Sequence, residues 1–365
     1  MARRRSAGRG GRPAGRPAEA SPAGRTAKAS PAAAIGAAAM AAVTLLTAQG
    51  CAPATDADAA ADAVTHSVTV AAAHEAYHFY RTTSDAAAAH GDMTQALSVV
   101  TSAAWAQAKG QYLALAAGTP VPRYRYGTPT FYVPALDGYP QWFMVAVPRS
   151  TVTGGRAGPA VNTLMLFSRA KKSEHWTLGG SAVLDRPLPA IAHDADGYAA
   201  AVSTTDPALL LRPDVVGATQ AAVVDDGPAS PAAAVIGAGP HTTGLYAAQA
   251  ARTRAERARG LQYQWLLQGA PYPQVGLRLE DGGALVMYGM YLNTTNEHPN
   301  LVAGAPIPVP AELTPLLDGP NEVGYHQVLA NWTYQLAAID PPATARNAKL
   351  DVIASQGFPS LGHAY

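Results

Sequence analysis

Hydrophobic positions in the early part of the chain recur at the spacing of an α-helix. Across residues 67–89, Val70, Tyr77 and Tyr80 lie at roughly helical intervals, and alanine fills most of the remaining positions. A short polar break follows, and residues 93–118 carry a second helical pattern. Its expected core positions are Leu97, Val100, Ala104 or Trp105, and Tyr112. The pattern therefore predicts two successive helices before any strand.

The pattern then changes to runs of aromatic and β-branched residues. Residues 123–134 and 139–150 are two such runs, and the Ala-Leu-Asp-Gly segment between them is typical of a hairpin. Residues 162–170 and 175–185 predict two further strands around a charged turn. The first half of the folded region is therefore expected to contain two helices followed by four strands.

From about residue 206 the same order of elements repeats. A helix is expected after Pro213, and residues 241–260 form an amphipathic helical pattern. The arginines expected on its polar face are Arg252, Arg254, Arg257 and Arg259. Strands are expected at residues 261–269, 274–282, 284–294, 324–340 and 348–357, with Asp281-Gly282-Gly283 as a hairpin turn.

Helices that precede antiparallel strands in both halves indicate an α+β fold rather than a parallel α/β sheet. We expect two tandem domains, at residues 65–200 and 205–365, each with helices packed on a curved antiparallel sheet. This order of elements is similar to that of the cone-like nuclear-transport-factor-two-like and cystatin-like superfold. The resemblance implies a bent sheet around a long helix, with room for a pocket between them. The two halves match in topology and only weakly in sequence.

The beginning of the chain differs from the rest in charge and composition. Residues 1–31 are basic and rich in glycine and proline, and residues 32–48 form an uncharged apolar run. This is the layout of a signal peptide, which we expect to span residues 1–50. The apolar run is near the lower length limit for a spanning helix, so a retained membrane anchor is the alternative. Outside this leader the net charge is negative, which argues against nucleic-acid binding.

Cys51 is the only cysteine of the chain and follows the small residue Gly50 directly after the apolar run. This placement resembles a bacterial lipobox, in which the cysteine sulfur carries a diacylglycerol; Ala48 and Gln49 depart from the usual residues. We therefore expect Cys51 to be the lipid attachment site and residues 51–64 to form a flexible tether. The expected location is the extracytoplasmic face of the cell membrane. The alternative is a secreted protein whose cleavage exposes a cysteine.

The motif His-Glu-Ala-Tyr-His at residues 74–78 matches the zinc-binding pattern H-E-x-x-H. His74 and His78 share one helix face and could hold Zn²⁺ while Glu75 polarises a water molecule. A third protein ligand is required, and Arg81 and Ser84 stand where the extended form of the motif needs Gly and His. The favoured interpretation is a partly exposed pair of helix histidines, with no metal and no cofactor.

Three segments, YGTPTFYVP, YPQWFMVAV and HWTLGGSAVLDRPLP, resemble an uncharacterised family of actinobacterial lipoproteins. The resemblance covers residues 65–365, and its motifs place proline and aromatic residues at strand ends without carrying chemistry. It implies an envelope lipoprotein. Tryptophans are expected to anchor the sheets against the helices, or alternatively to stack on a sugar or lipid: Trp142, Trp176, Trp265 and Trp332.

No phosphate-binding loop, dinucleotide fingerprint or G-x-S-x-G elbow occurs in the sequence. The leading hypothesis is a non-enzymatic, membrane-tethered envelope lipoprotein that binds or scaffolds a small ligand or an envelope protein. The membrane is its first expected partner, through Cys51, and nucleic acid is not expected as a partner. The alternative is a zinc-dependent cell-surface metallohydrolase that uses His74, Glu75 and His78.

Overall fold

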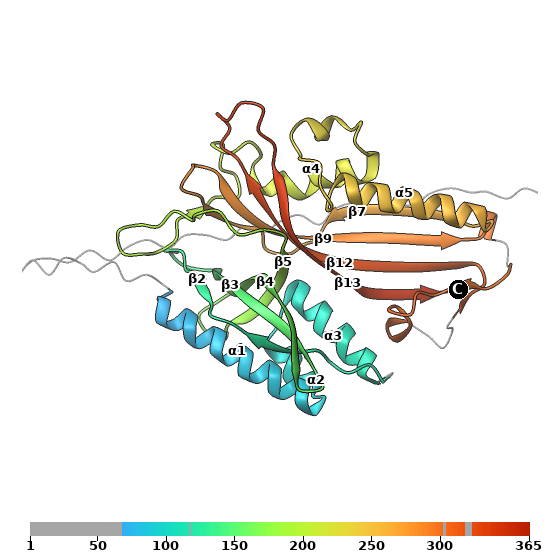
Figure 1. Cartoon of the computed structure of the whole chain (residues 1–365), viewed down its shortest axis with the longest axis horizontal. Helices are drawn as coiled ribbons and strands as arrows, with labels where there is room; N and C mark the ends of the chain where they lie inside the picture. The colour runs from blue at the N-terminus through green and yellow to red at the C-terminus, as the bar shows by residue number, and fades with distance from the viewer. Residues whose placement is uncertain (1–67, 117, 302–303, 318–322) are drawn as a thin grey trace, which may run out of the picture. The chain divides into compact units, whose positions relative to one another are not determined.

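The computed structural model describes residues 68–116, 118–301, 304–317 and 323–365 (Figure 1). All of them belong to one compact unit, residues 62–365. The elements of the first half are α1 (Val70–His90), α2 (Met93–Ser98), α3 (Ser102–Ala116), β1 (Arg123–Tyr126), β2 (Thr130–Tyr132), β3 (Gln141–Thr153), β4 (Arg156–Arg169), β5 (Thr177–Leu184) and β6 (Ala201–Val202).

The second half repeats helices before strands, as expected. Its elements are α4 (Pro213–Asp226), η1 (Pro231–Ala234), α5 (Thr243–Ala258), β7 (Gln262–Gly269), β8 (Val275–Arg278), β9 (Ala284–Glu297), η2 (Pro299–Leu301), β10 (Ile307–Pro308), η3 (Thr314–Leu316), β11 (Val323–Gly324), β12 (Gln327–Asp340) and β13 (Asp351–Ala364). The α+β class is therefore confirmed.

The second predicted helix is wrong as a single element, because it is broken between α2 and α3. The backbone of the break pairs with β5: the N–H of Leu178 donates to Val99 O at 3.0 Å, and the N–H of Thr101 donates to Leu178 O at 2.8 Å. The β-branched run Val99-Val100-Thr101 favours this extended conformation over a helix. Ser102 then starts α3 with a positive φ of 51°.

The main sheet has a symmetric strand order. It reads β1-β3-β4-β5-β13-β12-β9-β8-β6, with β2 also paired to β3 and β7 also paired to β9. In each half, two short strands share the outer edge of the first long strand, which is β3 or β9. The last long strands of the two halves, β5 and β13, then meet antiparallel at the centre, and the two-residue strand β6 joins the far edge beside β8.

The helices of both halves cover the same face of this sheet. Alternate residues of β3 pack against α1–α3. Following the residue pairs from strand to strand through β5, β13, β12 and β9 shows that the same face of the sheet packs against α4 and α5 in the second half. Figure 1 shows α1, α2 and α3 against one part of the sheet and α4 and α5 against the other. Phe143 and Phe167 stack at 5.0 Å beneath the first group, and Tyr288 is fully buried beneath the second.

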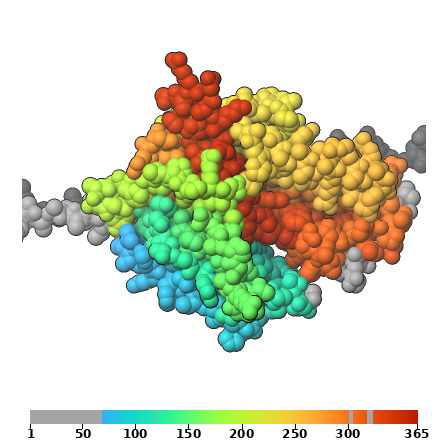
Figure 2. Space-filling view, viewed as in Figure 1, coloured from blue at the N-terminus to red at the C-terminus, as the bar shows by residue number. Residues whose placement is uncertain are grey.

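The opposite face holds a core to which both halves contribute. Met144 and Leu166 from the first half pack in one cluster with Met287 and Ile353 from the second. In the space-filling view, the surface of the first-half strands adjoins that of the C-terminal strands (Figure 2). The expected arrangement as two tandem domains is therefore not confirmed, and the boundaries at 65–200 and 205–365 stay a prediction.

Gly180 of the first half lies directly against a buried side chain of the second half. A Cβ at Gly180 would lie 2.7 Å from Cδ of Gln335, a buried residue on β12 whose amide donates to Tyr288 O at 2.8 Å. At the neighbouring Gly179, a Cβ would come no closer than 3.6 Å to any atom. The contact between the two halves therefore requires glycine at position 180, whereas position 179 has room for a Cβ.

We predict that Gly180→Ala lowers the free energy of unfolding by about 1–3 kcal/mol, the usual effect of overpacking a buried site. The control Gly179→Ala should be nearly neutral, because its added methyl meets only ordinary contacts. Urea unfolding of both variants measures the difference. Equal urea midpoints for the two variants would contradict a tight contact between Gly180 and the side chain of Gln335.

Asp340 is a fully buried carboxylate at the end of β12. Its two oxygens accept from the N–H of Leu211 at 3.3 Å each. Burial penalises the charged form and raises the pKa of Asp340 from 3.8 to about 7, only partly offset by the hydrogen bond from Leu211.

The native protein should therefore lose stability as the pH rises from about 4 to about 7, because the unfolded chain releases the Asp340 proton first. The loss should approach a few kcal/mol at about 1.4 kcal/mol per unit of pKa difference. In Asp340→Asn the part of this slope due to Asp340 should disappear, whereas the exposed control Asp137→Asn should keep the full slope. Thermal unfolding across this pH range measures both, and parallel profiles for wild type and Asp340→Asn would contradict the prediction.

Candidate functional site

The residues predicted to attach the protein to a membrane lie outside the described region. This applies to the signal peptide at residues 1–50, to Cys51 and to the tether at residues 51–64. Lipid attachment at Cys51 therefore stays a prediction. Among the described residues, no helix has the length and apolar character needed to cross a membrane.

The H-E-x-x-H motif lies on the exposed side of α1. His74, Glu75 and His78 are all exposed, and the His74 ring stacks on Phe131 with a centroid distance of 3.8 Å. Within the described part of the chain, no group of three or more His, Cys, Asp or Glu side chains is arranged to hold a metal ion. The zinc hypothesis thus gains no third ligand from this region.

A cavity of about 720 Å³ lies where the first half meets a loop of the second. We call it the junction cavity. Its walls come from the ends of β3, β4 and β5, from the break between α2 and α3, and from residues 273–275 before β8. Its buried apolar lining residues are Val100, Trp142, Leu166 and Val275. A volume of this size suits a small organic ligand.

The polar groups of the junction cavity centre on Gln141 and Arg169. Gln141 is 1% exposed, and its Oε1 accepts from Nε of Arg169 at 2.8 Å. Nε2 of Gln141 is buried and has no hydrogen-bond partner in the described region. The Arg169 guanidinium lies over the rings of Trp176, at 4.7 Å, and Tyr139, at 5.6 Å. It forms no ion pair with any described residue, so this wall offers an unpaired cation.

The lining of the junction cavity contains one carboxylate, that of Glu174. Glu174 pairs with Lys171 at 3.2 Å and accepts from the N–H of Ala170 at 3.2 Å, so its charge is partly satisfied. Nε2 of His175 lies 2.7 Å from Ser98 O. Ser102, the first residue of α3, also lines the cavity, and the first turn of α3 carries no acidic side chain. The partial positive charge of a helix N-terminus therefore adds to that of Arg169.

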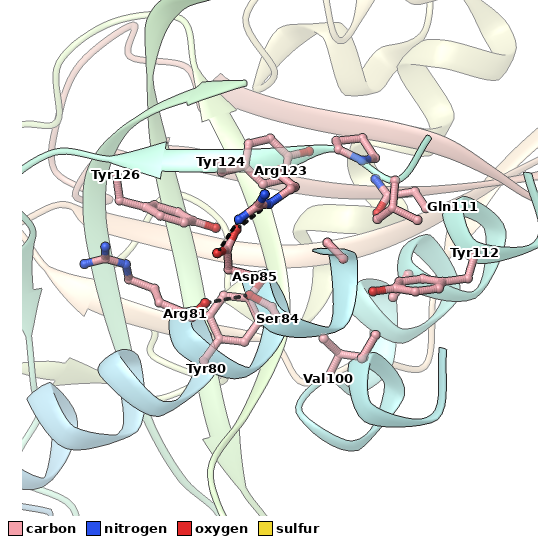
Figure 3. Close-up of a pocket in the computed structure, with 15 residues that line it drawn as sticks. Tyr80, Arg81, Ser84, Asp85, Val100, Gln111, Tyr112, Arg123, Tyr124 and Tyr126 are labelled. Atoms are coloured by element: carbon pink, nitrogen blue, oxygen red, sulfur yellow. Dashed lines mark hydrogen bonds and ion pairs between the residues drawn. The ribbon is translucent and has the colours of Figure 1, made fainter. Parts of the chain in front are cut away.

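A second site lies between α1, α3 and β1, and we call it the Tyr–Arg site. It consists of a hollow of about 70 Å³ (Figure 3) and an adjoining cleft of about 390 Å³, which share Arg81, Asp85, Arg123, Tyr124 and Tyr126 as lining residues. Asp85 and Arg123 form a bidentate ion pair, with 2.9 Å between Oδ1 and Nε and 2.7 Å between Oδ2 and Nη2. The hydrogen bond from Arg123 is the main reason that the pKa of Asp85 lies below its usual range.

Tyrosine hydroxyls surround the smaller hollow. In Figure 3 the hydroxyls of Tyr112 and Tyr126 point toward the space between the helices and β1. Burial raises the pKa values of Tyr80, Tyr112 and Tyr126, so all three stay protonated hydrogen-bond donors near neutral pH. The Tyr112 hydroxyl and Nε of Arg81 are buried without a hydrogen-bond partner in the described region.

Trp142 is predicted from the sequence as a sheet anchor or stacking residue, whereas Gln141, Arg169 and the Tyr–Arg site are not. Trp142 is 8% exposed, and it both packs in the shared core and lines the junction cavity. One signal was available for Gln141, which is a polar residue at the start of a strongly apolar strand. Nothing local could reveal the cavities, because each joins segments far apart in the chain.

A protein-family model matches residues 40–356, which include most of the described region. The chain belongs to the DUF8094 family, a domain of unknown function. This DUF8094 chain is also similar to an uncharacterized lipoprotein of Streptomyces avermitilis, with 30% identity over 162 residues. That match covers 43% of the chain and 44% of the relative, so the chain spans less than half the length of the relative.

The predicted membership of an actinobacterial lipoprotein family is thereby confirmed. No solved structure matches the DUF8094 chain significantly. The similarity to nuclear-transport-factor-two-like and cystatin-like domains therefore stays a prediction.

Proposed function

We propose that the protein is a membrane-tethered lipoprotein of the bacterial envelope that binds a small organic anion in the junction cavity and catalyses no reaction. The observation that carries the binding role is the Arg169 guanidinium, which is positioned by Oε1 of Gln141 and has no ion pair among the described residues, on the wall of a cavity of about 720 Å³. Buried donors and cations are costly unless they are paired. An anionic ligand would supply the missing partner.

The shape and lining of the cavity favour a ligand with an apolar body. Trp142, Leu166 and Val275 offer an apolar surface beside the cationic wall. A pocket with an apolar floor and a few convergent polar groups is the usual arrangement for small-molecule binding. These features favour a small ligand over the alternative of an envelope protein as partner.

Membrane tethering is supported by the sequence around Cys51 and by a related lipoprotein. Cys51 follows an uncharged apolar run, and the relative from Streptomyces avermitilis is a lipoprotein. Two acyl chains give durable anchoring, whereas one gives only marginal membrane binding, and a lipobox cysteine carries at least two. Attachment at Cys51 would hold the folded body on the extracytoplasmic face of the membrane.

The fold itself is best explained as a tandem repeat of one α+β unit whose copies share a sheet. The symmetric strand order around the β5–β13 pair supports this, as does the position of helices α1 to α5 on one face. Under this proposal the junction cavity belongs to neither copy alone, because its walls include β3–β5 and the segment before β8.

Binding can be tested with 1-anilinonaphthalene-8-sulfonate, a fluorescent aromatic anion, and with its neutral analogue N-phenyl-1-naphthylamine. We expect saturable binding of the sulfonate and about a tenfold loss of affinity in Arg169→Gln, the usual size of one charge-assisted hydrogen bond. The neutral analogue should bind wild type and Arg169→Gln alike. Arg254→Gln, an exposed change on α5, serves as the control. Equal affinity of the wild type and Arg169→Gln for the sulfonate would contradict the proposed role of the cavity.

Tethering is tested by Cys51→Ala in the producing cell. The variant should appear in the medium, whereas the wild type should stay in the membrane fraction and carry the added mass of a lipid. If Cys51→Ala remains in the membrane with its leader intact, the apolar run at residues 32–48 acts as the anchor instead.

A further inference from the structure

The larger cleft of the Tyr–Arg site has an unbalanced charge. Its lining includes three arginines, Arg81, Arg123 and Arg125, but a single carboxylate, Asp85. Asp85 is already paired with Arg123 through two hydrogen bonds. Within the described region, neither Arg81 nor Arg125 forms an ion pair. Two guanidinium groups of this cleft therefore lack an anionic partner.

A further unpaired arginine lies behind the cleft. Arg149 is 8% exposed and packs over the ring of Tyr124 at 4.4 Å, and its Nη2 donates to Oε1 of Gln356 at 3.2 Å. Nε of Arg149 is buried without a hydrogen-bond partner in the described region, and no described carboxylate pairs with its charge. A buried cation without a counter-charge is costly. Because no carboxylate neutralises Arg149, its positive potential adds to that of the arginines in the cleft.

Aromatic rings hold Arg81 in place. Its guanidinium lies 5.5 Å from the centre of the Tyr77 ring and 5.1 Å from that of Tyr126. Such stacking occupies the faces of the guanidinium and leaves its edge donors available. Burial raises the pKa of Tyr77 to about 12, so this ring remains neutral beside the cation. The cleft thus presents positioned N–H donors, and its one carboxylate, Asp85, is already paired.

We propose that the Tyr–Arg site binds a phosphate group, with the guanidinium edges of Arg81 and Arg125 as its main donors. Arginine matches the geometry of phosphate oxygens with two parallel N–H donors, and two unpaired guanidinium groups in one cleft favour a phosphate over a single carboxylate. The larger cleft, at about 390 Å³, has room for a phosphate and the sugar or glycerol attached to it. It shares no lining residue with the junction cavity, so the two sites can be tested separately.

The phosphate could belong to a lipid headgroup or to a soluble phosphate ester, and two titrations separate these sources. The full chain in neutral detergent micelles is titrated with glycerol 3-phosphate. In the second titration, the micelles contain increasing amounts of phosphatidylglycerol, or of phosphatidylcholine as the zwitterionic control. Binding of glycerol 3-phosphate alone assigns the site to soluble esters. Binding of phosphatidylglycerol alone, without phosphatidylcholine, assigns it to an anionic lipid. Either result supports a phosphate site.

The variants decide whether the arginines are responsible. We expect Arg81→Gln combined with Arg125→Gln to weaken phosphate binding at least about tenfold, since two charge-assisted contacts are lost. The control Arg254→Gln should bind like the wild type. Because Arg81 is stacked between rings, the exposed single change Arg125→Gln serves as a second variant that keeps the packing intact.

Failure to bind either probe, or equal binding by wild type and Arg125→Gln, would overturn the proposal. Sulfonate binding in the junction cavity should be unchanged in these variants. Loss of that binding as well would point to unfolding of the double variant, and the outcome for Arg125→Gln then decides.

Discussion

The structure depends on the antiparallel pairing of β5 with β13. Only two residue pairs form it, Leu184 with Ala354 and Val183 with Ser355, and the N–H of Asp185 extends it by donating to Ile353 O at 2.8 Å. These few hydrogen bonds would be weak alone, since each contributes about 1 kcal/mol. The fully buried core beneath them, shared by both halves, supplies the larger stabilisation. The pairing fixes the register, and the register decides which side chains of the two halves meet.

Several features follow from this register. Because side chains alternate across a strand, an antiparallel match between corresponding strands puts the helices of both halves on one face. No helix of the described residues covers the opposite face, which is closed by the side chains of both halves together with Ile191 and Ala199 from the connecting segment. The space left between the ends of β3–β5 and residues 273–275 is the junction cavity. The proposed ligand site is thus a product of the sheet pairing.

Local elements were predictable from the sequence because their signals are local. The helices after Thr69 and Pro213 begin at a side-chain cap and at an N-terminal proline, and β8–β9 turns at Asp281-Gly282-Gly283. Of the expected core positions in residues 93–118, Val100, Ala104 and Tyr112 are buried, whereas Trp105 is 41% exposed.

The rest required contacts that no local pattern encodes. The hydrophobic spacing predicts a continuous helix through residues 99–101, but pairing with Leu178 and the β-branched side chains of this run favour an extended conformation. The β5–β13 pair joins strands about 170 residues apart in sequence, and the symmetric strand order was visible only as a repeat of element types. The two candidate sites could not be predicted for the same reason, since each gathers side chains from three or more elements.

Unpaired arginines on aromatic rings connect the two proposed sites. The chain is only 14% charged, and Arg81, Arg149 and Arg169 each lie over a tyrosine or tryptophan where many proteins would place a carboxylate. A carboxylate would neutralise the cation and compete with a ligand for its donors. An aromatic ring orients the guanidinium and leaves its net charge in place. Since the side-chain entropy is lost on folding rather than on binding, an incoming anion meets donors that are already positioned, and more of the interaction energy appears as affinity.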